Sequence, residues 1–75
     1  MITCQVETYS GFRLHERPRR FTWGEEWLEV RRVVERWSGP DHLYFKVVAG
    51  DGRIFLLTYQ EQADAWEVKL MGPQG

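Results

Sequence analysis

The sequence predicts an all-β fold, a strongly bent antiparallel meander of five or six strands that curls into a small open barrel or roll. Three observations lead to this prediction. Apolar and polar residues alternate near both ends of the chain. Turn signals at 38–42 and 49–53 separate segments that are rich in β-forming residues. Four Trp, four Phe and three Tyr supply an aromatic core for a chain of only 75 residues.

The length of the chain limits it to one small β domain, 1–75, in which 72–75 ("GPQG") is expected to be a flexible tail. Domains of this size are only marginally stable unless something reinforces them. Cys4 is the only cysteine, which excludes a disulfide within the chain. Aromatic packing, or a partner subunit, must therefore supply the stability.

The two terminal segments have the alternation of half-buried strands. Residues 2–8 and 65–70 each place apolar side chains on one face and mostly polar ones on the other. The apolar members are Ile2, Cys4 and Val6 in the first segment, and Trp66, Val68 and Leu70 in the second.

The segments on either side of Gly50-Asp51-Gly52 predict a hairpin whose register can be tested by arithmetic. A three-residue loop gathers the apolar side chains on one face and gives Gly52 a positive φ. The expected pairs are Leu43–Tyr59, Phe45–Leu57 and Val47–Phe55, and the next hairpin continues with Tyr59–Trp66, Leu57–Val68 and Phe55–Leu70. A second apolar face, with Tyr44, Val48, Ile54 and Leu56, predicts a sheet covered on both sides, by its own curl or by another copy.

The stretch 17–37 permits two interpretations. Trp27, Val30, Val34 and Trp37 recur at helical spacing, so the alternative fold is α+β with a helix at about 25–37. The strand interpretation uses a four-residue loop from Gly24 to Trp27 and a β-bulge at Arg31-Arg32 in a long bent strand, 27–37. Its expected pairs are Trp23–Leu28, Phe21–Val30, Val33–Val47, Glu35–Phe45 and Trp37–Leu43. We expect the strand, because these pairs agree with those of the neighbouring hairpins.

Several pieces of the sequence carry a resemblance to known families. They are Glu16-Arg17-Pro18, Phe21, Trp37, Tyr44-Phe45-Lys46-Val47, Asp51-Gly52 and Trp66-Glu67. From about residue 2 to residue 70 the chain resembles a family of small uncharacterised bacterial cytoplasmic proteins. Residues 44–66 are also similar to the C-terminal segment of Y-family-polymerase-like mutagenesis proteins. The larger family implies a bacterial, cytoplasmic protein and favours strands over 19–37, but it brings no established activity.

Catalytic and metal-binding patterns are absent from the sequence. Cys4, His15 and His42 lie too far apart in the chain to form the closely spaced ligand pairs of zinc sites. The expected register points the Glu35 side chain toward the inner face of the sheet. We interpret Glu35 as a residue at the rim of the barrel that pairs with an arginine such as Arg20. We therefore predict no enzyme activity, no catalytic residue, no metal and no cofactor.

Candidate binding residues fall into two groups. Arg13, Arg17, Arg19 and Arg20 precede Phe21 and Trp23, and Arg31 and Arg32 could extend this cluster. Arginines beside aromatic rings on a small β scaffold are typical of single-stranded nucleic-acid binding, which is the alternative function. Trp27 in an expected loop, and Tyr44 on the second face, instead predict a protein-binding anchor.

The leading functional prediction is a non-catalytic interaction module that binds a protein or self-associates. The net charge of −1 gives no strong field for nucleic acid. No apolar run approaches the about 20 residues that a membrane span needs, and no signal peptide is visible, so no membrane partner is expected. The single thiol fits a reducing cytoplasm.

Overall fold

The computed structural model describes residues 2–8 and 17–73, and it is all-β. Its strands are β1 (Ile2–Cys4), β2 (Val6–Thr8), β3 (Pro18–Trp23), β4 (Glu26–Ser38), β5 (His42–Ala49), β6 (Arg53–Gln60) and β7 (Ala65–Pro73). The predicted fold class is confirmed, with seven strands in place of five or six. The helical alternative at about 25–37 is wrong, because β4 occupies that stretch. In the described part of the chain no helix is long and apolar enough to cross a membrane.

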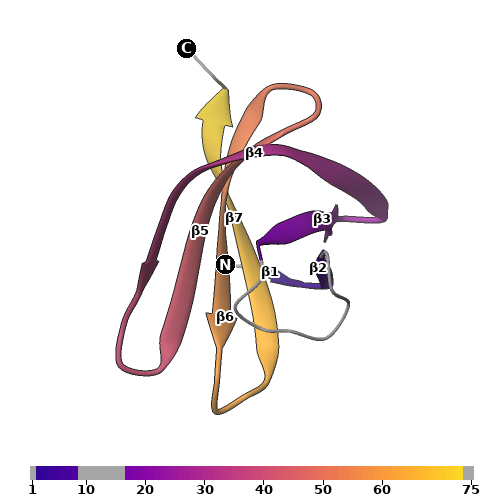
Figure 1. The fold of residues 1–75 in the computed structure, drawn as a ribbon. Coiled ribbons are helices and arrows are strands. Elements are labelled where there is room, and N and C mark those ends of the chain that lie inside the picture. The colour runs from indigo at the N-terminus through magenta and orange to yellow at the C-terminus, as the bar shows by residue number, and fades with distance from the viewer. Residues whose placement is uncertain (1, 9–16, 74–75) are drawn as a thin grey trace.

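The seven strands form one antiparallel sheet in the order β1-β7-β6-β5-β4-β3-β2. β1 and β2 lie at opposite ends of this order, yet only Gln5 separates them in the chain. The stretch 2–8 therefore pairs with β7 through its first half and with β3 through its second half. At the switch, Gln5 accepts a hydrogen bond from the Thr22 N–H and donates one to the Thr22 hydroxyl, both at 2.9 Å. The sheet is consequently curled into an open half-barrel (Figure 1).

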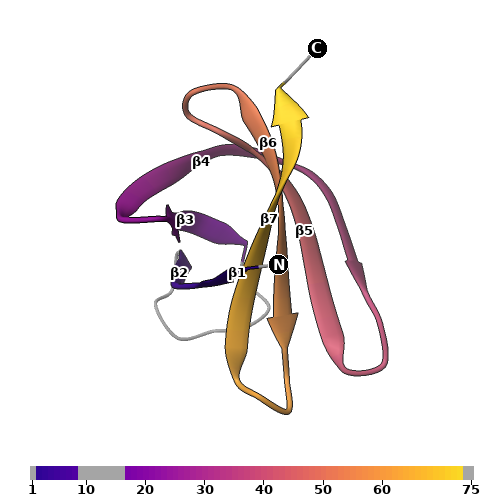
Figure 2. The ribbon, with the colours of Figure 1, turned by 180° about the vertical axis from the view of Figure 1, so that it is seen from behind.

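β4 is the strand that bends the sheet. It is 13 residues long, and it pairs with β3 through its first part and with β5 through the rest. Figure 2 shows it sweeping over one end of the molecule before it descends beside β5. Its register with β5 shifts at Arg31 and again at Val34, which lack partners in the ladder. Such bulges increase the local bend and twist of a strand, so they allow β4 to serve both halves of the sheet. The bulge predicted at Arg31-Arg32 is confirmed.

The two C-terminal hairpins have the predicted registers. Val47 pairs with Phe55, Phe45 with Leu57 and Leu43 with Tyr59, and the pairs of the following hairpin also match. Gly52 has a φ of +92°, as a three-residue loop requires of its last position. These registers place the apolar side chains of β5, β6 and β7 on one face of the sheet, where they form the core. The buried core residues are Phe21, Leu43, Phe45, Val47, Ala49, Phe55, Leu57, Tyr59 and Val68.

The predicted register of β3 with β4 is wrong by two residues. Phe21 pairs with Leu28 and Trp23 with Glu26, so the loop contains only Gly24 and Glu25. Gly24 has a φ of +63° at the first loop position, which is the pattern of a type II′ turn and suits the twist of a two-residue hairpin.

The predicted register of β4 with β5 is right at Val33–Val47 and wrong beyond it. Glu35 pairs with Lys46 and Trp37 with Tyr44, one residue away from the expected partners. The second bulge at Val34 causes the difference, because it inserts a residue that the alternation did not reveal. As a result, Glu35 faces solvent rather than the core, with 61% of its side chain exposed.

The predicted flexible tail begins too early. β7 continues to Pro73, with Gly72 opposite Ile54 and Pro73 opposite Arg53. The ladder shifts register near Met71, and Gly72 accommodates the irregularity with a φ of +142°. Residues 74–75 lie outside the described residues.

Candidate binding surface

A cluster of rings lies on the outer face of the sheet, where β4 and β5 meet. Tyr44 alternates along β5 with the core residues Leu43 and Phe45, so its side chain leaves the opposite face. Trp37 is its cross-strand partner, with ring centroids 5.3 Å apart and planes 12° apart. The His42 ring stacks on Tyr44 at 5.8 Å and 20°. We call Trp37, His42 and Tyr44 the hairpin surface.

The hairpin surface is accessible because, in the described part of the chain, no strand pairs with the second half of β4 on the side away from β5. The register of β3 with β4 ends at Glu29, and from Arg32 onward β4 pairs with β5 only, within the described part of the chain. Figure 1 shows this half of β4 running beside β5 on one side. Trp37 is 43% exposed and Val34 is 37% exposed. Large apolar side chains with this exposure are available to a partner.

The apolar character continues from the hairpin surface across the outer face of β5 and β6. Val48 is buried, and Ile54 and Leu56 are half-buried. The Lys46 ammonium and the Glu35 carboxylate lie 3.9 Å apart beside the rings. Thr58, opposite Tyr44, is buried and its hydroxyl has no hydrogen-bond partner among the described residues. The accessible part of this face is thus the group of rings with the Lys46–Glu35 pair beside it, and apolar groups with charged neighbours are common in protein interfaces.

The predicted arginine cluster is partly neutralised. Arg19 and Arg20 both contact the carboxylate of Glu7, at 3.7 and 3.1 Å. Arg17 lines a small depression beside Arg31 and Arg32. Arg13 lies outside the described residues. The described arginines therefore form two groups: Arg19 and Arg20 share the Glu7 carboxylate, and Arg17, Arg31 and Arg32 line one depression.

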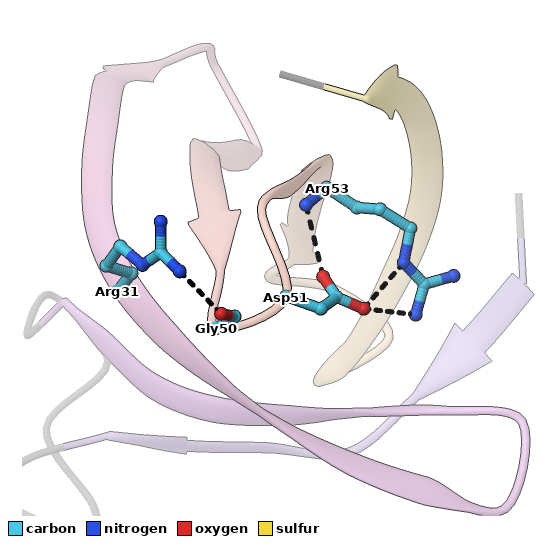
Figure 3. Close-up of polar contacts among 4 residues, drawn as sticks. All are labelled: Arg31, Gly50, Asp51 and Arg53. Carbon is cyan, nitrogen blue, oxygen red and sulfur yellow. Dashed lines mark hydrogen bonds and ion pairs between the residues drawn. The ribbon is translucent and has the colours of Figure 1, made fainter.

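Arg31 is directed toward the β5–β6 turn. Its guanidinium donates a hydrogen bond of 2.6 Å to the Gly50 carbonyl (Figure 3). In the same turn Arg53 donates to Asp51 from its backbone N–H and from Nε, at 3.1 and 2.8 Å. These hydrogen bonds from Arg53 hold the pKa of the Asp51 carboxyl below its usual value. Arg32, by contrast, is exposed and pairs with Val48 on the outer face.

Trp27 lies in β4 opposite Thr22 and not in the predicted loop. Its side chain is 43% exposed, and the Arg20 guanidinium lies 4.6 Å from its ring centroid. Trp27 is thus as exposed as Trp37, but it contacts a guanidinium, whereas Trp37 stacks on another aromatic ring.

The candidate nucleophile and metal ligands are not brought together. Cys4 is half-buried and pairs with Trp66, and burial, with a smaller contribution from Glu67, raises the pKa of its thiol to about 11. A thiol in this state is a poor nucleophile at neutral pH. His15 lies outside the described residues. Within 2–8 and 17–73 no group of three or more His, Cys, Asp or Glu side chains is placed to hold a metal ion.

Of the hairpin surface, the sequence singled out Tyr44 as a binding residue but not Trp37 or His42. The length of the turn between β4 and β5 would have identified Trp37 as the partner of Tyr44. Four residues, Gly39 to His42, separate the paired Ser38 and Leu43, and Gly39 donates a hydrogen bond of 2.8 Å to the His42 carbonyl. A four-residue loop at "GPDH" would have placed Trp37 opposite Tyr44.

Comparisons of the chain with protein-family models, with curated proteins and with solved structures find no match. The resemblances noted in the sequence therefore stay expectations, and the functional argument depends on the geometry of the hairpin surface.

Proposed function

We propose that the protein is a non-catalytic interaction module that binds a protein through the hairpin surface. The observation that carries this proposal is the Trp37–Tyr44 pair, which stacks at 5.3 Å across β4 and β5 and leaves Trp37 43% exposed. Trp and Tyr are the side chains most enriched among the residues that dominate binding energy at protein interfaces.

The position of the pair also favours a protein ligand. Tyr44 is held between Trp37 and His42, so the rings enter a complex with little conformational freedom left to lose. The neighbouring edge of β4 offers backbone groups that an extended segment can pair with. Anchoring rings beside a strand edge thus give a partner both apolar contact and directional hydrogen bonds.

The experiment places a photoreactive benzoylphenylalanine at position 37 and, as a matched control, at Glu61, which is exposed in the β6–β7 turn. We expect illumination in cells to give a protein adduct at position 37 and none at 61. Excess wild-type protein added to extracts should compete for the adduct, whereas excess Trp37→Ser should not. Equal labelling at both positions, or competition by Trp37→Ser, would contradict the proposal.

Single-stranded nucleic acid is the second candidate ligand, and one observation favours it. Arg32 and Lys46 lie on the same outer face as the rings, where phosphate contacts and base stacking could combine. Titration with a labelled oligonucleotide at low and high salt separates the candidates. Binding that weakens steeply with salt, and that Trp37→Ser abolishes, would favour nucleic acid over a protein.

A further inference from the structure

We propose that the small depression at the bend of β4 binds a phosphate group of the protein partner, so that the ligand is a phosphorylated protein. This inference rests on the proposed function and specifies the chemistry of its ligand. The depression has a volume of about 50 Å³, room for one group the size of a few water molecules. It is lined by Arg17, Pro18, Val30, Arg31, Arg32 and Val33, and we call it the arginine depression.

The charge of the arginine depression suits an anion. Three guanidinium groups line it, and no carboxylate does so among the residues that the structure describes. Arg32 has no ion-pair partner within 2–8 and 17–73, whereas Arg19 and Arg20 share the carboxylate of Glu7. A hollow lined by charges of one sign concentrates the field and attracts a ligand of the opposite sign.

A β-bulge brings two consecutive arginines to the same depression. In a regular strand Arg31 and Arg32 would point to opposite faces. Arg31 instead lacks a partner in the ladder, Arg32 pairs with Val48, and both side chains line the depression. Bulges are over-represented beside functional sites, where they redirect a side chain.

Gly50 holds this bulge in place. Its N–H donates a hydrogen bond of 2.8 Å to the Glu29 carbonyl, and its own carbonyl accepts the 2.6 Å hydrogen bond from Arg31 (Figure 3). A guanidinium has five N–H groups, so this contact fixes Arg31 and leaves it donors for a ligand. A side chain that is fixed in advance loses little conformational freedom when it binds.

The arginine depression lies where the pairing of β3 with β4 stops. The last pair of that ladder is Arg20 with Glu29. Pro18, whose side chain is fully buried, has no N–H with which to extend the ladder. The start of β3 therefore lies beside the bulge without pairing to it in the described part of the chain, and side chains line the space between them.

A phosphate monoester fits this depression better than the diester backbone of a nucleic acid. A monoester carries a charge of about −1.5 to −2 and three acceptor oxygens, which guanidinium groups bind in bidentate pairs. A nucleic-acid strand needs a groove that follows successive phosphates. The arginine depression has room for one group, and the other described arginines of the cluster share Glu7.

One partner segment can occupy the arginine depression and the hairpin surface together. Trp37 follows Arg32 by five positions in β4, which corresponds to roughly 15 Å along an extended strand. A phosphorylated side chain and an apolar side chain about five residues apart would span this distance. Recognition of phosphorylated motifs by clustered arginines is a recurrent mode of peptide binding.

The phosphate site is tested by NMR titration with N-acetyl-O-phosphoserine amide and, separately, with inorganic phosphate. We expect saturable shifts of the Arg31 and Arg32 Nε–Hε signals with a Kd of about 1 mM for the phosphoserine amide, and none with N-acetylserine amide. Arg32→Gln should raise this Kd about tenfold, through the loss of charge-assisted hydrogen bonds. Arg19→Gln, the same change at an arginine outside the depression, should leave it unchanged. Absence of saturable shifts, equal effects of the two variants, or binding of inorganic phosphate alone would overturn the site.

Photocrosslinking in extracts tests the phosphorylated protein separately from the proposed function. With benzoylphenylalanine at position 37, phosphatase treatment of the extract or the additional change Arg32→Gln should reduce the adduct several-fold, whereas nuclease should not. An adduct that resists phosphatase and Arg32→Gln would overturn this inference and leave the proposed function standing, and an adduct lost to nuclease would overturn it in favour of nucleic acid. If no adduct forms that wild-type protein competes away, the proposed function fails and the protein partner of this inference fails with it.

Discussion

The Tyr59 hydroxyl donates a 2.5 Å hydrogen bond to the Asp64 carboxylate across the β6–β7 turn. Tyr59 belongs to the core, whereas Asp64 is an exposed turn residue with a φ of +49°. One side chain thus joins the core to a residue in the left-handed backbone region, which non-glycine residues seldom occupy. The contact also makes the stability of the fold depend on pH in an unusual range.

Stability should fall between about pH 10 and pH 12. The hydrogen bond to Asp64, burial and the nearby carboxylates raise the pKa of Tyr59 to about 12. Tyrosines of the unfolded chain ionise near pH 10, so the folded state holds this proton more tightly. The resulting stabilisation is complete below the unfolded pKa and disappears as the pH rises through the folded one. Urea midpoints measured at intervals above pH 9 test this.

Two variants isolate the contribution of Tyr59 from other groups that titrate at high pH. Tyr59→Phe should be less stable at pH 8, but it should lose less stability than wild type between pH 10 and 12. Asp64→Asn tolerates the positive φ and removes the charge, so its pH dependence should also be shallower. Parallel curves for all three proteins would show that the hydrogen bond does not control the transition.

Gly52→Ala should destabilise the protein by about 1–2 kcal/mol, because a Cβ is strained at a φ of +92° even though nothing else lies within 4 Å. Gly39→Ala is the matched control. A Cβ at Gly39 meets the Tyr44 ring at 3.7 Å, an ordinary contact, and its φ is not in the positive range that disfavours side chains. Urea unfolding should place Gly39→Ala within about 0.5 kcal/mol of wild type. Equal losses would contradict the role assigned to the φ of Gly52.

Cys4 should react slowly with iodoacetamide while the protein is folded. At pH 8, a thiol with a pKa of about 11 has about 100-fold less thiolate than a thiol with the ordinary pKa. The rate, followed by mass spectrometry, should rise sharply in urea above the unfolding midpoint. Glu67→Gln should accelerate the folded reaction only slightly, because burial is the larger cause of the shift and Glu67 the smaller. A folded rate equal to the unfolded rate would refute this account.

Trp37 and Phe55 should differ in their importance for stability. Phe55 is fully buried and contacts the rings of Phe21 and Trp23 at 5.0 and 5.2 Å, so Phe55→Ala should cost about 3–5 kcal/mol. Trp37→Ala removes a 43% exposed ring and one stacking contact, with an expected loss of about 1 kcal/mol. Urea unfolding measures both values. A large loss in Trp37→Ala would make Trp37 a core residue and weaken its assignment to binding.

The sequence predicted the β5–β6–β7 region well because two signals agreed there. The turn at Gly50–Gly52 fixed the loop length, and alternation then placed Phe45, Leu57 and Val68 on one face. A slip of one residue would have turned every one of these side chains away from the core. Agreement between turn chemistry and burial left a single register.

The stretch 24–38 was harder because its pattern does not determine the pairing. Alternation correctly placed Val33 opposite Val47, but it gave no sign that the adjacent Val34 is an extra residue. The structure resolves this through β5, whose inward residues are already fixed by β6: Val33 meets Val47, and Val34 becomes the extra residue of a bulge. The hairpin surface depends on that choice, since the shift is what brings Trp37 opposite Tyr44.

The sequence alone determined the fold class, the turns after β5 and β6, and most of the core, since all of these follow from local chemistry and period-two burial. Only the tertiary structure decided where β4 changes partner, which arginines are neutralised and which tryptophan stacks on Tyr44. The second bulge, at Val34, and the ion pairs across strands depend on residues that are distant in the chain, so alternation alone does not record them. For this protein, the candidate binding residues belong mostly to that second group.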